Sequence, residues 1–138
     1  MPEPDRPEEL RIKWGMLGLP ENHRPSGIDL IAAERVRQMS EKGWTAEHDD
    51  GHADGSLAMA AACYAANERI YVERRYARLV GFVDPWPWQN WEDDRKAGGN
   101  HVTRVPLRGE ARKTALIKAG ALIAAELDRI ERREARDA

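Results

Sequence analysis

The chain has 138 residues, with 22 Lys and Arg against 24 Asp and Glu and a formal net charge of −2. This length fits a single domain with its own core, and the near balance of charge gives no reason to expect bulk nucleic acid or an anionic membrane as a partner. The one cysteine, Cys63, excludes an intramolecular disulfide and a CxxC-type metal site. Because Cys63 lies in an apolar run, we expect a buried structural thiol.

The ends of the chain set the expected organisation. Residues 1–9 are acidic and rich in proline, unlike a secretory signal. No apolar run reaches the roughly 18–20 residues that a membrane-spanning helix needs, so we expect a cytoplasmic protein. We expect a flexible Pro-rich segment at 1–26, a single helical domain at 27–133 and a frayed C-terminus at 134–138.

Two helices are predicted in the first half. Ile28, Ala32, Val36 and Met39 recur at helical spacing, and Gly43 is typical of the position just after a helix. Residues 57–66 are apolar nearly all round, which predicts a second helix enclosed by its neighbours. Asp54 or Ser56 is the expected cap of this second helix.

The second half predicts a long loop followed by a long helix. Residues 67–82 fit either an extension of the second helix or a short strand, and the prolines at 84–106 indicate one long loop. Residues 110–133 form the best predicted helix, with an apolar stripe of Leu116, Ala119, Gly120, Ile123, Leu127 and Ile130. The expected fold is a small all-α bundle of three to four helices, with the Trp-rich loop packed across it.

Charged side chains on apolar helix faces need partners. Helical geometry places Glu126 within the apolar stripe and Arg35 on the apolar side of the first helix. Because an unpaired buried charge is costly, Arg35 is a candidate partner of Glu126. Such a pair would either tie the two helices together or line a pocket.

The acidic run at 47–52 is the densest group of possible ligands. It is either a solvated linker with capping residues or a binding site. Clustered carboxylates suit Mg²⁺, whereas His48 and His52 would suit a transition metal only if they lay on a helix. Gly51 and the neighbouring acids argue against a helix there.

Aromatic and basic residues in the Trp-rich segment give a second set of candidates. Five tryptophans in 138 residues is a high count. Packing is the main use that we expect of Trp44, Trp86, Trp88 and Trp91, and stacking on a nucleobase is the alternative. Arg95 follows directly and is placed to approach a phosphate. The sequence contains neither a P-loop nor a nucleophile elbow, so covalent catalysis is not expected.

The run ERVRQMSEKGWTAEHDDGHADGSLAMAAACYA, followed by WPW and LIKAGALIAAELDRI, resembles a family of small proteins encoded by tailed phages and prophages. Its pattern is close to ERxRQ…GWTxEHDD…LAxAAxxYA…KAGALIxAExxR. The resemblance covers about residues 34–130, and residues 67–83 and 96–108 fall outside the pattern. It implies a phage or prophage origin, hence a bacterial host cell, and supplies no activity.

Two shorter patterns resemble other families. An all-α chain with an ExxD-type pair is similar to the MazG-like nucleotide pyrophosphohydrolases, which implies Mg²⁺ held by Glu34, Glu47, Asp50 and Glu126. The first acidic pair of that family is incomplete here, because position 37 is Arg. Residues 43–50 are also similar to the opening of the ryanodine-receptor repeat domain, whose later pattern is absent.

These observations favour a binding module for a small nucleotide-type ligand. In a phage setting such a protein would sequester a host-defence signal. One alternative is a MazG-like, Mg²⁺-dependent nucleoside triphosphate pyrophosphohydrolase, and a second is a protein–protein inhibitor of a host enzyme with the Trp loop as its anchor. Whether the protein is an enzyme and whether it forms a homo-oligomer are left open. The expected ligand-binding residues are Glu34, Arg35, Gln38, Trp44, His48, Asp49, Asp50, His52, Arg95 and Glu126.

Overall fold

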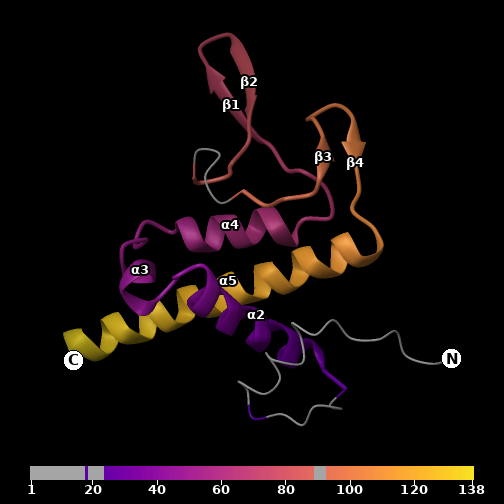
Figure 1. Ribbon diagram of the computed structural model, residues 1–138. Coiled ribbons are helices and arrows are strands. Elements are labelled where there is room, and N and C mark those ends of the chain that lie inside the picture. The colour runs from indigo at the N-terminus through magenta and orange to yellow at the C-terminus, as the bar shows by residue number, and fades with distance from the viewer. Residues whose placement is uncertain (1–17, 19–23, 89–92) are drawn as a thin grey trace, which may run out of the picture.

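The structure is a computed structural model that describes residues 18, 24–88 and 93–138. These residues form four helices and two antiparallel hairpins (Figure 1). The helices are α2 (Gly27–Glu41), α3 (Ala46–Asp50), α4 (Ser56–Ala65) and α5 (Gly109–Asp137), and the strands are β1 (Val72–Tyr76), β2 (Leu79–Val83), β3 (Gly98–Gly99) and β4 (Arg104–Val105). The expectation of an all-α bundle is therefore wrong, because the segment between α4 and α5 folds into hairpins.

Helix α5 is the axis of the domain, with α4 and α2 packed along opposite sides of it (Figure 1). The core lies mainly between α4 and α5, where Leu57 and Tyr64 face Ala119 and Leu122. Alanines on both helices allow a close approach, since the distance between packed helices depends on the side chains at the contact. Cys63 is buried, as the sequence predicted, and burial raises the pKa of its thiol.

Helix α2 begins with a capping box and approaches α5 closely. The Ser26 hydroxyl accepts from the Asp29 amide and the Asp29 carboxylate accepts from the Ser26 amide, which satisfies two donors at the helix start. A Cβ atom added to Gly120 of α5 would lie 2.5 Å from Cδ1 of Ile31. Glycine at this position therefore lets α2 pack against α5.

The apolar stripe predicted for α5 is rotated away from the core. Ala119 is buried as expected, but Leu116, Ile123 and Leu127 are 45%, 49% and 57% exposed. The face that packs on α4 consists of small residues around Leu122. The predicted stripe was drawn through the largest apolar side chains of α5. The closely packed contact with α4 is instead formed mainly by its smallest side chains.

Both hairpins lie in the stretches outside the phage-family pattern. The β1–β2 register pairs Val72 with Val83 and Tyr76 with Leu79, which resolves the choice between helix and strand in favour of strands. The short β3–β4 hairpin interrupts the predicted loop at 84–106. Gly99 adopts a φ of +85°, and a Cβ there would lie 2.3 Å from the Thr103 carbonyl oxygen, so this turn requires glycine.

The C-terminal helix continues beyond the predicted end at Arg133 to Asp137. The predicted Pro-rich segment lies almost entirely outside the described residues. Within the residues that the structure describes, no helix is both long and apolar enough to cross a membrane.

Candidate functional site

Residues 46–50 form a short helix where the sequence predicted a loop. Thr45 caps this helix α3, because its hydroxyl accepts from the His48 amide at 3.3 Å. Glu47 and Asp49 lie in the first turn, where acidic side chains interact favourably with the helix dipole. Gly51 is the C-cap. It therefore ends the helix rather than preventing it.

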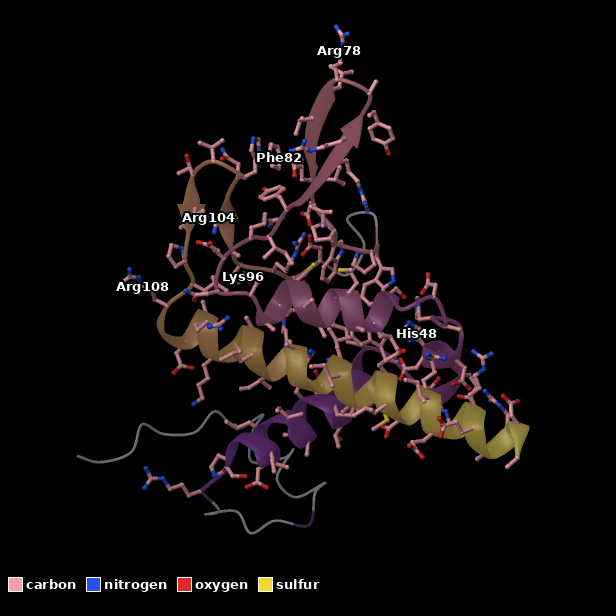
Figure 2. The ribbon with its side chains drawn as sticks, turned by 180° about the vertical axis from the view of Figure 1, so that it is seen from behind. His48, Arg78, Phe82, Lys96, Arg104 and Arg108 are labelled. Atoms are coloured by element: carbon pink, nitrogen blue, oxygen red, sulfur yellow. The ribbon has the colours of Figure 1, made fainter. Side chains whose placement is uncertain are left out.

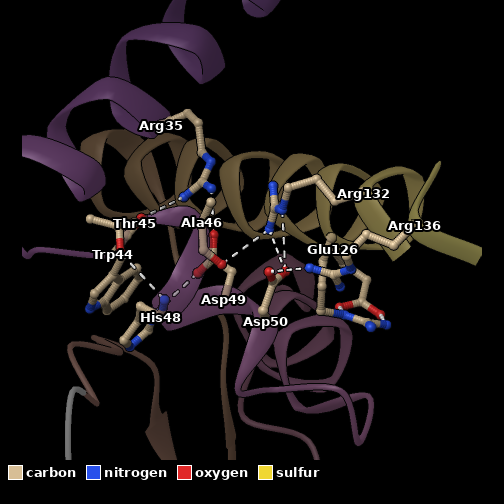
Figure 3. Close-up of polar contacts among 11 residues, drawn as sticks. Arg35, Trp44, Thr45, Ala46, His48, Asp49, Asp50, Glu126, Arg132 and Arg136 are labelled. Carbon is tan, nitrogen blue, oxygen red and sulfur yellow. Dashed lines mark hydrogen bonds and ion pairs between the residues drawn. The ribbon is translucent and has the colours of Figure 1, made fainter. Parts of the chain in front are cut away.

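The centre of this region is an ion pair between Arg35 of α2 and Asp49 of α3 (Figure 3). Arg35 Nη2 lies 2.5 Å from Asp49 Oδ2, and both residues are buried. Arg35 Nη1 also donates to the Trp44 carbonyl at 3.5 Å, and His48 Nδ1 lies 3.1 Å from the second Asp49 oxygen. Arg35 therefore pairs with Asp49 instead of the predicted Glu126.

Arginines of α5 engage the other acidic candidates. Asp50 accepts from Arg132 at 2.8 Å and from Arg136 at 3.2 Å (Figure 3), and the hydrogen bond from Arg132 lowers the pKa of Asp50. Glu126 lies 2.7 Å from Arg129 in the next turn of the same helix. The Asp50 pairs hold α3 against the C-terminal half of α5, whereas the Glu126 pair lies within α5 itself.

The four carboxylates assigned to Mg²⁺ by the MazG-like resemblance do not converge. Glu34 pairs with Arg37 at 2.6 Å, Asp50 and Glu126 pair with arginines of α5, and Glu47 is exposed. Across the described ranges, no group of three or more His, Cys, Asp and Glu side chains is placed to hold a metal ion. The donor set found here therefore does not fit the magnesium site that the resemblance implies.

Tryptophan and histidine side chains form a contiguous cluster beside the Arg35–Asp49 pair. Trp44 stacks on His48 with ring centroids 5.8 Å apart, and His52 contacts both His48 and Trp88. Trp86 in turn contacts Trp88 edge to face at 5.5 Å. We call these five residues the Trp–His cluster. Its contacts with the core agree with the packing role expected of Trp44, Trp86 and Trp88, and Trp91 lies outside the described residues.

Arg95 organises the Trp-rich segment from within. Its guanidinium lies 2.8 Å from both Asp84 and Asp93 and 4.7 Å from the centre of the Trp86 ring. The side chain is only 3% exposed. Hydrogen bonding to Arg95 lowers the pKa of Asp93. Arg95 is thus committed to internal partners, while the neighbouring Lys96 is exposed.

A cavity of about 400 Å³ opens between α2 and α5. It mixes cations and carboxylates around an apolar wall. The lining includes the cations Arg37, Lys42, Lys113 and Lys118, the acids Glu34, Asp94 and Glu110, and the apolar residues Leu30, Ala33 and Ile117. We call this the α2–α5 cavity.

Asp94 is shared by two of the cations. It lies 3.6 Å from Lys42 Nζ and 4.0 Å from Lys118 Nζ. Burial lowers the pKa of Lys118, whose ammonium also lies over the Tyr64 ring. Asp94 and Glu34 both act on this half-buried ammonium, and charges interact more strongly where water is excluded.

A narrower recess adjoins this cavity and contains an unpartnered polar atom. Gln38, Trp44, Tyr64 and Leu122 line it together with residues of the main cavity. Gln38 is only 2% exposed, and its Oε1 has no hydrogen-bond partner in the structure. A buried acceptor without a partner costs about 1–3 kcal/mol, and the recess, with a volume of about 10 Å³, admits a donor no larger than a water molecule.

The predicted site residues thus fall into separate places. The cavity or its recess is lined by Glu34, Gln38 and Trp44. The adjoining ion pair and histidine contacts involve Arg35, His48, Asp49 and His52. Arginines of α5 pair with Asp50 and Glu126, and Arg95 lies within the Trp-rich segment. Lys118 was not among the predicted site residues, although its spacing from Ala115 and Leu122 marks it as facing inward. Comparison with known proteins found no matching family model, curated protein or solved structure.

Proposed function

We propose that the protein binds a small nucleotide-type anion in the α2–α5 cavity. The observation that carries this proposal is a cavity of about 400 Å³ with four cations around an apolar wall, joined to a recess with an unpartnered amide oxygen. Small-molecule sites commonly have volumes of this order, with mostly apolar linings and a few polar groups that fix orientation.

The cationic end of the cavity suits a phosphate. Lys42 and Lys118 approach Asp94 from two elements, so a phosphate group that displaced the Asp94 carboxylate from between them would gain two charge-assisted contacts. Arg37 borders the same space, and its ion pair with Glu34 holds its guanidinium in place. Such a fixed guanidinium binds with little loss of conformational freedom.

The remaining surface suits a nucleoside. Leu30, Ala33 and Ile117 provide an apolar wall for a planar base. Gln38 Oε1 lies in the adjoining recess, whose volume of about 10 Å³ admits a donor no larger than a water molecule, so a water that bridges to the ligand would supply its missing partner. Glu110 at the rim of the cavity is placed to accept from a ribose hydroxyl.

We further propose that the ligand is held rather than hydrolysed. Three of the four carboxylates that a MazG-like enzyme would place on Mg²⁺ are engaged by Arg37, Arg129 and Arg132, and the fourth, Glu47, is exposed. The phage-family resemblance then favours sequestration of a host-defence nucleotide as the biological role. Hydrolysis and inhibition of a host enzyme stay the alternatives.

Isothermal titration calorimetry with mononucleotides, dinucleotides and ADP-ribose-type compounds tests the site. Lys118→Met removes the buried ammonium at nearly constant volume, and Arg133→Gln on the exposed end of α5 is the matched charge control. We expect Lys118→Met to weaken binding of the responding compound by at least about tenfold, the loss typical of one charged hydrogen bond. Equal binding by both variants would place the ligand outside this cavity.

A further inference from the structure

The two hairpins concentrate positive charge that the whole-chain balance conceals. Residues 70–83 and 96–108 contain six Lys and Arg but one Asp or Glu, a net charge of +5. Since the chain as a whole carries −2, the remainder carries −7. We define the hairpin surface as these two segments. The expectation of no bulk nucleic-acid binding was based on the total charge, which averages over this separation.

Four of the six basic residues are labelled in Figure 2, and they lie at separate places on the hairpin surface. Arg78 lies at the tip of the β1–β2 hairpin, Arg104 on the β3–β4 hairpin, and Lys96 and Arg108 where the second hairpin joins the rest of the domain. The side chain of Arg104 is 71% exposed, although it pairs with Glu68 at 2.6 Å. Cations spaced along a surface in this way suit a chain of phosphates better than a single anion.

Exposed rings lie between these cations. Phe82 of β2 stacks on His101 of the second hairpin, with ring centroids 4.3 Å apart and planes 10° from parallel. Tyr71 contacts His101 edge to face and donates to the Gly99 carbonyl. Phe82 is 48% exposed. The two hairpins therefore meet in a ring stack that stays open to solvent.

A small pocket lies at this junction. It has a volume of about 170 Å³ and is lined by the aromatic residues Tyr71, Phe82 and His101, by Arg69 and Arg104, and by Glu68, Ile70 and Asn100. Its size suits one planar ring rather than a whole nucleotide. Its amide and guanidinium groups could hydrogen-bond the edge of a base, as expected of a site that accepts an unstacked base.

We propose that the hairpin surface binds single-stranded nucleic acid, with its arginines on phosphates and one base in the pocket beside Phe82 and His101. A single strand is favoured over a duplex because stacking on a side chain needs an exposed base face. This inference rests on residues that the α2–α5 cavity does not use. The two proposals therefore stand or fall separately.

Fluorescence anisotropy with labelled homopolymers of thymidine and of uridine tests this proposal. We expect wild-type affinity to fall with salt between about 50 and 200 mM, with a log–log slope of roughly 0.7 for each phosphate contacted. The double variant Arg78→Gln/Arg108→Gln should lower that slope by roughly 0.7 per arginine. The control Arg133→Gln/Arg136→Gln removes two arginines from the far end of α5 and should leave the slope unchanged.

Phe82→Ala tests the pocket independently of charge. Loss of base stacking should weaken binding at least about fivefold at every salt concentration, while Lys118→Met should have no effect. The two homopolymers distinguish DNA from RNA. The proposal would be overturned if the protein bound neither homopolymer, or if the Arg133→Gln/Arg136→Gln control lost as much affinity as the test variant. Preferential binding to anionic vesicles or to an acidic peptide would also overturn it.

Discussion

Arg35 and Asp49 form a buried ion pair that joins α2 to α3, with Arg35 Nη2 2.5 Å from Asp49 Oδ2. Asp49 is completely buried, and His48 contacts its second oxygen. The pair fixes Trp44 as well, because Arg35 also donates to the Trp44 carbonyl. Trp44 borders the recess that holds Gln38. The acidic motif that looked like a ligand site thus holds one wall of the proposed binding site.

Breaking this pair should destabilise the fold strongly. Arg35→Met leaves the Asp49 carboxylate buried without its main partner, and removing one member of a buried pair costs about 3–5 kcal/mol. Equilibrium unfolding in urea measures the loss. Arg37→Met, on the same helix but partly exposed, is the control and should cost less. A loss below about 1 kcal/mol for Arg35→Met, typical of surface pairs, would contradict the structural role.

Lys118→Met should raise stability while it weakens ligand binding. Burial lowers the pKa of Lys118, so the folded protein pays to keep this ammonium charged. Methionine fills similar space without a charge. We expect a higher urea midpoint for Lys118→Met than for wild type, together with the loss of nucleotide affinity described above. A lower midpoint would show that the ammonium contributes to the fold instead of being reserved for a ligand.

The contact between Gly120 and Ile31 should behave as a tight fit. A Cβ at position 120 would lie 2.5 Å from Ile31 Cδ1, so Gly120→Ala forces the two helices apart and should cost about 1–3 kcal/mol despite the better helix propensity of alanine. Thermal unfolding of Gly120→Ala, Ile31→Ala and the double variant checks this. The double variant should be more stable than the sum of the single losses predicts. Additive losses would mean that the contact is loose.

Ionisation of Tyr64 should make the stability of the protein depend on pH above about 10. Burial raises the pKa of Tyr64 to about 12 from its ordinary value of 10. Because the folded-state pKa is the higher one, the neutral phenol stabilises the fold below pH 10, and this contribution is lost as the pH rises from 10 to about 12. The difference in unfolding free energy between wild type and Tyr64→Phe should therefore shrink over that range. A constant difference would contradict this assignment.

The sequence predicted the long helices because their apolar periodicity and end signals are local. The α2 prediction, from Ile28 to a stop at Gly43, and the 57–66 helix agree with α2 and α4 to within a few residues. The hairpins gave no comparable signal. Every residue of β2 is exposed, so no alternation between core and solvent marked it, and its β-branched and aromatic residues fitted either structure.

The site was predicted less well than the helices. The motif at 47–52 stands out in the sequence, but its charges meet partners from α2 and α5 that only the tertiary structure brings near. The cavity uses Arg37, Lys113 and Lys118, ordinary members of charged helices whose role depends on the relative rotation of α2 and α5. That rotation follows from Gly120 and the alanines of α5. The sequence gives these small residues a weaker signal than the large apolar residues of the predicted stripe.

The α2–α5 cavity is tested most directly by incubating the protein with a panel of nucleotides, dinucleotides and ADP-ribose-type compounds in the presence of Mg²⁺. Mass spectrometry then reads the filtrate and the material released by heating. We expect one compound to vanish from the filtrate with wild type and with Arg133→Gln, to return intact on heating, and to stay in the filtrate with Lys118→Met. Conversion of a compound to its monophosphate and pyrophosphate would establish hydrolysis. An unchanged panel would contradict the proposal that the cavity binds a nucleotide.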